Sequence, residues 1–145
     1  MNLSHTLKKE IEFLAPNVYK NTKFFQLASN GSLTVLQIRR YVKNLRFLFQ
    51  STYQLIMLAE NEARKNNNLE LAEFFSEKKD EEEGHEHWAS EDLNQLGDPE
   101  ADTVRSKINP ATIYLVKELK GLIKKDPKFF IIYMFYARNF RKLWI

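Results

Sequence analysis

The feature that most constrains the fold is a stretch of about thirty residues, from a cap at Ser32 or Thr34 to Lys65, that contains neither Gly nor Pro. The whole chain of 145 residues has only four Gly and four Pro, which argues against a turn-rich β protein. We therefore predict an all-α fold built around one long helix. Its apolar positions recur at the three- and four-residue spacing of a helix face: Ile38, Tyr41, Val42, Leu45, Leu48, Tyr53, Ile56 and Ala59.

Four further helices and no strands are expected, because residues that cap or interrupt helices divide the rest of the chain. Pro16 interrupts the first helix and Gly97 stops the third. Asn109 and Asp126 each precede a Pro, which is typical of an N-cap followed by the first helical residue. These signals place the helices at residues 3–14, 69–96, 109–125 and from 126 onward, with a short segment at 24–27.

The composition favours a single domain covering residues 1–145. Hydrophobic residues make up 43% of the chain, so it can bury a core. The net charge of +3 comes from mixed charges with no basic block, which predicts no nucleic-acid partner. There is no Cys, no signal peptide is recognised, and the longest apolar run, Phe129 to Ala137, is too short to span a bilayer. We expect a cytoplasmic protein that has no membrane partner.

The segment from Asp80 to Trp88, with the sequence DEEEGHEHW, is the strongest candidate for a functional site. Stepping by about 100° per residue from Leu71 places Glu82 and His85 within the core stripe of the third helix, and Glu81 on its flank. His87 falls on the opposite face and is expected to be exposed. Gly84 in mid-helix indicates close packing or a local distortion, since Gly costs about 1 kcal/mol there against Ala.

Two interpretations of this segment stay open. Glu81 and Glu82 are spaced to converge with His85, and carboxylate and imidazole ligands suit iron, manganese or zinc. Alternatively, Lys78 lies on the same stripe and pairs with Glu81 or Glu82 in an ordinary salt bridge. The segment is therefore predicted to be either a metal site or a salt-bridged helix face.

Several segments together resemble the haem-oxygenase-like superfamily, in particular its branch of iron-containing redox enzymes and di-iron oxidases. The resemblance covers essentially the whole chain, and its most specific part is the EExGHxxW pattern of residues 81–88. It implies an all-helical haem-oxygenase-like bundle, an iron cofactor and oxidoreductase activity on an unidentified small molecule. Glu81 and His85 match the first two metal ligands of the di-iron branch. The resemblance is also carried by residues 24–27, 30–41 and 92–97.

The chain departs from the family pattern near its C-terminus. Ala137 and Arg138 stand where the family has its next carboxylate, and no His-x3-Asp-x2-His pattern follows. We expect a partial domain that lacks the last two or three helices of the family fold, and therefore an incomplete metal site. The apolar fifth helix would then lack neighbours, which predicts a homo-oligomer formed through that exposed helix.

Four functional hypotheses follow. The first is an iron-dependent oxidoreductase whose site is incomplete in this chain. The second is haem binding through His5, and the third is a ferritin-like site built on the Glu-x-x-His spacing of Glu82 and His85, although no second such motif is present. The fourth is a non-catalytic interaction or structural domain. A thiaminase-type reaction is disfavoured because it needs a Cys nucleophile.

Overall fold

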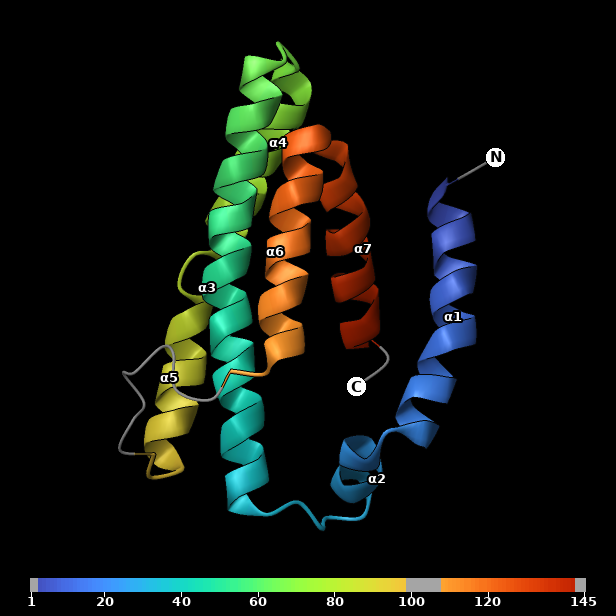
Figure 1. Ribbon diagram of the computed structural model, residues 1–145, viewed down its shortest axis with the longest axis vertical. Coiled ribbons are helices and arrows are strands. Elements are labelled where there is room, and N and C mark those ends of the chain that lie inside the picture. The colour runs from blue at the N-terminus through green and yellow to red at the C-terminus, as the bar shows by residue number, and fades with distance from the viewer. Residues whose placement is uncertain (1–2, 99–107, 143–145) are drawn as a thin grey trace. The chain divides into compact units, whose positions relative to one another are not determined.

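The computed structural model describes residues 3–98 and 108–142, and every regular element in them is an α-helix (Figure 1). The predicted all-α class is therefore confirmed. The helices comprise the five expected ones, the short segment near residue 24, which forms a helix of its own, and one extra helix made by a break in the third. Their bounds are α1 (Leu3–Asn21), α2 (Lys23–Ser29), α3 (Val35–Lys65), α4 (Leu69–Glu82), α5 (His85–Gln95), α6 (Pro110–Lys125) and α7 (Lys128–Lys142).

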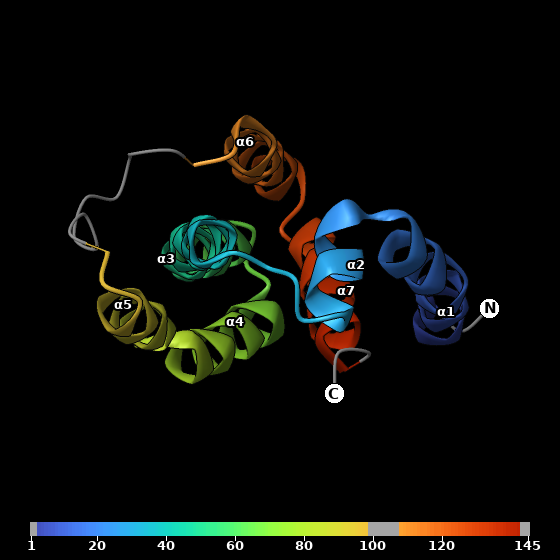
Figure 2. The ribbon, with the colours of Figure 1, turned by 90° about the horizontal axis from the view of Figure 1, so that it is seen from below.

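The helices form two compact units, residues 35–130 and residues 1–34 with 131–145. In the first unit α3 is central: α4 and α5 pack on one side of it and α6 packs on another (Figure 2). The long helix predicted from the sequence is thus the one that organises this unit. Its core is made of fully or nearly fully buried side chains: Val42, Leu55, Ile56, Ala59, Ala63, Leu71, Ala72, Phe75, Ala89, Leu93, Val116, Leu119, Ile123 and Phe130.

Most helix ends lie where capping residues predicted them. The Asn109 side chain accepts a hydrogen bond from the backbone N–H of Ala111, at 2.9 Å, at the start of α6. Asp126 accepts one from the N–H of Lys128, also at 2.9 Å, at the start of α7. Gly97 follows α5 with a φ of 67°, the left-handed conformation that ends many helices.

The third predicted helix is not continuous, contrary to the expectation of one helix from Leu69 to Leu96. It divides into α4 and α5 at Gly84, which has a φ of 84° and a ψ of −4°. Gly reaches this left-handed region without the steric cost that Cβ imposes on other residues. Leu71 and Phe75 of α4 and Leu93 of α5 are nevertheless all buried, so the predicted core stripe is confirmed on both sides of the break.

In the second unit, α1 continues through Pro16 to Asn21, so the predicted interruption is wrong. A Pro inside a helix removes one backbone hydrogen bond and costs about 3 kcal/mol. Apolar positions continue across it at four-residue spacing, with Ile11 and Ala15 buried and Tyr19 half-buried. The ring of Tyr19 also meets that of Phe25 in α2, edge to face at 4.9 Å. These contacts favour a helix that extends past the proline.

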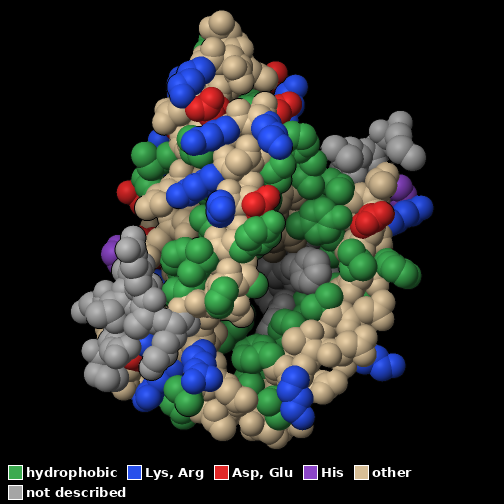
Figure 3. Space-filling view, in the orientation of Figure 1, with side chains coloured by type: hydrophobic (Ala, Val, Ile, Leu, Met, Phe, Trp, Pro, Cys, Tyr) green, Lys and Arg blue, Asp and Glu red, His purple; other side chains and the backbone are tan. Residues whose placement is uncertain are grey.

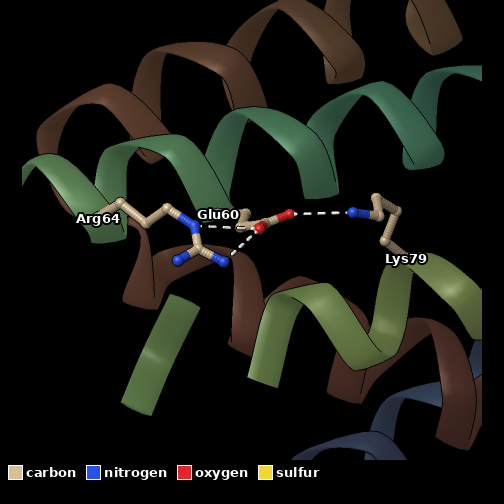
Figure 4. A network of polar contacts seen from close by, with 3 residues as sticks. All are labelled: Glu60, Arg64 and Lys79. Atoms are coloured by element: carbon tan, nitrogen blue, oxygen red, sulfur yellow. Dashed lines mark hydrogen bonds and ion pairs between the residues drawn. The ribbon is translucent and has the colours of Figure 1, made fainter. Parts of the chain in front are cut away.

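Charged groups tie α3 to its neighbours in the first unit. The Glu60 carboxylate accepts hydrogen bonds from Arg64, at 2.8 and 3.1 Å, and from Lys79 of α4, at 3.3 Å (Figure 4). The hydrogen bond from Arg64, supported by Lys79, holds the pKa of the Glu60 carboxyl below its usual value against the opposing effect of burial. This network links the C-terminal half of α3 to α4.

A buried ion pair joins the other half of α3 to the segment that follows α5. The Lys43 ammonium lies 2.9 Å from the Asp98 carboxylate, and both side chains are less than one-tenth exposed. One turn earlier on α3, the Arg39 guanidinium donates hydrogen bonds to the backbone carbonyl of Leu96 at the end of α5. Both contacts fix the C-terminal end of α5 on α3.

No helix in the described part of the chain combines the length and the apolar character needed to cross a bilayer.

Candidate metal site at the junction of α4 and α5

Glu82 and His85 meet across the break at Gly84. Glu82 is the last residue of α4 and His85 is the first residue of α5. The Nδ1 atom of His85 lies 2.7 Å from Oε2 of Glu82, which is a hydrogen-bond distance. The side chain of His85 is 15% exposed and that of Glu82 is 30% exposed. The predicted convergence of these two residues is therefore confirmed, at a half-buried position.

Two aromatic rings enclose the imidazole of His85. Phe49 of α3 meets it edge to face with the ring centroids 5.8 Å apart. Trp88, one turn further along α5, lies against it with the centroids 4.5 Å apart and the planes at 37°. Phe49 is half-buried, whereas Trp88 is 57% exposed, so the ring is covered by α3 and open toward solvent beside the indole. The two rings pack against the imidazole, which is 15% exposed, and restrict its orientation.

Glu81 does not join this pair, and the expectation that it faces the interior with His85 is wrong. Its carboxylate pairs with the Lys78 ammonium at 2.5 Å, and the side chain is 60% exposed. The helix stops one residue after Glu81, so the four-residue spacing to His85 no longer corresponds to a single helical turn. The predicted alternative, a salt bridge between Lys78 and Glu81, is the arrangement that forms.

His87 points away from the site, as predicted, and its side chain is 78% exposed. Its nearest charged group is Glu86, with Nε2 and Oε1 3.6 Å apart. The third histidine, His5, is exposed on α1. Ala137, at the position where the family resemblance expects a carboxylate, is exposed on α7, and the side chain of Arg138 lies outside the described residues.

The separation of the Glu82–His85 pair suits one kind of metal geometry. Two donor atoms 2.7 Å apart, each about 2.1 Å from a metal, subtend an angle of about 80° at it. That angle is close to the 90° between neighbouring ligands of an octahedral metal and well short of the tetrahedral angle. Oxygen and nitrogen donors in octahedral geometry are typical of iron and manganese rather than structural zinc.

The pair supplies two ligands. Within the described ranges, 3–98 and 108–142, no group of three or more His, Cys, Asp or Glu side chains is placed to hold a metal ion. Both Glu82 and His85 still fit the donor chemistry, because deprotonated carboxylate and neutral imidazole are what such ions bind. The described residues therefore supply two donor atoms here, joined to each other by a hydrogen bond, and a metal ion would need further ligands.

Sequence reasoning named Glu82 and His85 but missed the residues that orient them. The indole of Trp88 follows His85 by three residues, a spacing at which helical side chains meet, so that contact had a local signal. The contact with Phe49 had none, because 36 positions separate the two residues along the chain.

Comparison of the chain with protein-family models, with curated proteins and with solved structures finds no match.

Proposed function

We propose that this chain is a haem-oxygenase-like helical domain that binds iron through Glu82 and His85 and serves an iron-dependent oxidoreductase. The observation that carries the proposal is the 2.7 Å pairing of a carboxylate and an imidazole at a helix break, with a separation suited to neighbouring positions on an octahedral ion. The family resemblance of residues 81–88 supports the choice of iron. The remaining ligands would come from outside the described residues or from another chain.

In this proposal each residue of the site has a separate task. Glu82 supplies one carboxylate oxygen and a negative charge, and His85 supplies a neutral ring nitrogen. Phe49 and Trp88 fix the ring orientation and limit the access of water to its faces. A bound iron would supply the capacity to bind and reduce O2, which amino-acid side chains lack.

The direct test is a titration with Mn²⁺, whose electron paramagnetic resonance signal distinguishes free from bound ion and which avoids oxidation during the measurement. Replacing His85 or Glu82 by Ala should weaken binding at least tenfold, since each removes one of two ligands. His87→Ala is the matched control, because it removes an exposed imidazole two residues away and should bind Mn²⁺ like the parent. Equal binding by all four proteins would remove the metal proposal.

The second candidate function is a non-catalytic domain that assembles through its C-terminal helix. Phe129, in the first turn of α7, is 44% exposed, and the apolar side chains at positions 131–136 are only half-buried. Apolar surface of this kind favours association with another chain. The expected result is a dimer or larger species that persists in 0.5 M salt and weakens in a Phe129→Lys variant. A monomer by light scattering at all concentrations tested would exclude this function.

A further inference from the structure

The outer face of α4 carries a row of acidic side chains. Glu73, Glu77 and Asp80 are all exposed, and they follow one another at intervals of four and then three residues. This spacing places them on one face of the helix, opposite the buried Leu71 and Phe75. We call these three residues the acidic row.

A row of lysines follows one flank of α6. Lys117, Lys120 and Lys124 are exposed and are spaced by three and then four residues, beside the buried Leu119 and Ile123. Lys and Arg side chains are visible over α6 on the face drawn in Figure 3. We call these three lysines the basic row.

Neither row is neutralised within the described part of the chain. Elsewhere in the same unit cations meet carboxylates, as in the pairs of Lys78 with Glu81 and of Lys79 with Glu60. The six side chains of the two rows make no ion pair or hydrogen bond with another described residue. Like charges three or four residues apart on a helix repel one another, so each row is a stripe of uncompensated charge. Because α4 and α6 pack on different sides of α3, the two rows of one chain do not meet (Figure 2).

The two rows match each other when the helices are antiparallel. Along α4 the intervals are four and then three residues, and along α6, followed in the reverse direction, they are also four and then three. Both rows therefore extend over about 10 Å, with charges at the same levels. A parallel arrangement would pair only the ends of the rows and leave the middle charges out of step.

We infer that this surface binds a second copy of the chain, with α4 of one copy lying antiparallel against α6 of the other. Charge complementarity identifies the occupant, because the chain itself presents both members of the matched pair. The contact is heterologous: one face of each copy meets a different face of the next, so it gives open oligomers or, where the geometry closes, a small ring or a dimer with two such contacts. The opposed residues are Glu73 with Lys124, Glu77 with Lys120, and Asp80 with Lys117.

Salt sensitivity is the first test, and it uses the unmodified protein. Exposed charges interact over about 10 Å at 0.1 M salt and over about 3 Å at 1 M. The weight-average mass measured by sedimentation equilibrium should therefore exceed that of the monomer in 20 mM NaCl and fall toward it in 0.5 M NaCl. A monomer in 20 mM NaCl overturns the inference. A larger species that is equally stable in both salts also overturns it and points instead to apolar association through α7.

Charge exchange is the second test. One variant reverses the acidic row (Glu73→Lys, Glu77→Lys, Asp80→Lys) and another reverses the basic row (Lys117→Glu, Lys120→Glu, Lys124→Glu). Each alone should self-associate at least tenfold more weakly than the parent, whereas an equimolar mixture of the two should associate, because the reversed rows are again opposite in sign. A mixture that associates no better than either variant alone overturns the inference.

The matched control for the reversed basic row is Lys9→Glu, Lys20→Glu, Lys23→Glu, which reverses three exposed lysines on α1 and α2 and changes the net charge equally. It should retain at least the parent's association, and a loss as large as that of the reversed basic row would assign the effect to net charge. Since all these positions are exposed, the variants should keep the parent's helical circular dichroism. Self-association does not involve Glu82 or His85, so this inference can fail or hold independently of the metal proposal.

Discussion

Replacing Gly84 by Ala distinguishes a broken third helix from a continuous one, because the two structures predict changes of opposite sign in the free energy of unfolding. In a continuous helix the substitution would stabilise the protein by about 1 kcal/mol, the difference in helix propensity. With φ at 84°, Ala must enter the left-handed region, which costs about 1–2 kcal/mol. An added Cβ would lie 3.8 Å from Cδ2 of His87, an ordinary contact, so backbone strain is the whole expected cost.

Gly121 provides the matched control. It lies inside α6, and an added Cβ would meet no neighbouring atom within 4 Å. Gly121→Ala should therefore stabilise the protein by about 1 kcal/mol through helix propensity alone. The two Gly→Ala variants should differ in unfolding free energy by roughly 2–3 kcal/mol. For a chain of this size each kcal/mol of unfolding free energy shifts Tm by about 2–4 °C.

Urea unfolding, followed by circular dichroism at 222 nm and by tryptophan fluorescence, measures both free energies. A Gly84→Asn variant should lose less stability than Gly84→Ala, because Asn tolerates the left-handed region better than Ala does. If Gly84→Ala is as stable as the parent or more stable, then α4 and α5 are one continuous helix, and Glu82 and His85 meet by ordinary three-residue helical spacing rather than across a break.

Three further predictions concern the core and the buried charges of the same unit. Phe75→Ala should destabilise the protein by about 3–5 kcal/mol by urea unfolding, because the ring is fully buried and lies against Phe130; a loss under 1 kcal/mol would contradict that packing. Glu60→Gln should cost about 1 kcal/mol at pH 7. Because the folded-state pKa of Glu60 is lowered, this cost should vanish as the pH falls below the ordinary value of 4.5; a cost that is constant from pH 7 to pH 3 would contradict it. Lys43→Met should cost about 3–5 kcal/mol by leaving Asp98 buried without its cation, and the double variant with Asp98→Leu should recover most of that loss; strictly additive losses would contradict a direct pair.

The sequence predicted the helix ends well because their signals are local. Asn109 and Asp126 cap through hydrogen bonds to residues two positions away, and Gly97 needs only its own backbone freedom. The long α3 was equally predictable, since no Gly or Pro interrupts its apolar periodicity. Helix existence and helix ends therefore follow from residues that are neighbours in the chain.

The break at Gly84 was harder to predict, because a single Gly in a periodic segment fits both a continuous helix and a helix end. The same uncertainty misplaced Glu81, whose expected orientation assumed regular helical steps up to His85. The contacts of Lys43 with Asp98 and of Arg39 with Leu96 had no sequence signal at all, since more than fifty residues separate the partners. Those contacts depend on how α5 packs on α3, which local patterns do not specify.

The break also changes the electrostatic setting of the candidate site. As the last residue of α4, Glu82 lies at the negative end of that helix dipole, where a carboxylate is disfavoured. The turn at Gly84 starts a new helix at His85, so the same carboxylate also lies at the positive end of α5, where negative charge is favoured. In a continuous helix neither end would be present, and Glu82 would have only its side-chain partners. Gly84 thus places Glu82 at a favourable helix end beside its partner His85, and a substitution that restores a continuous helix would remove that helix end while keeping the three-residue spacing of the pair.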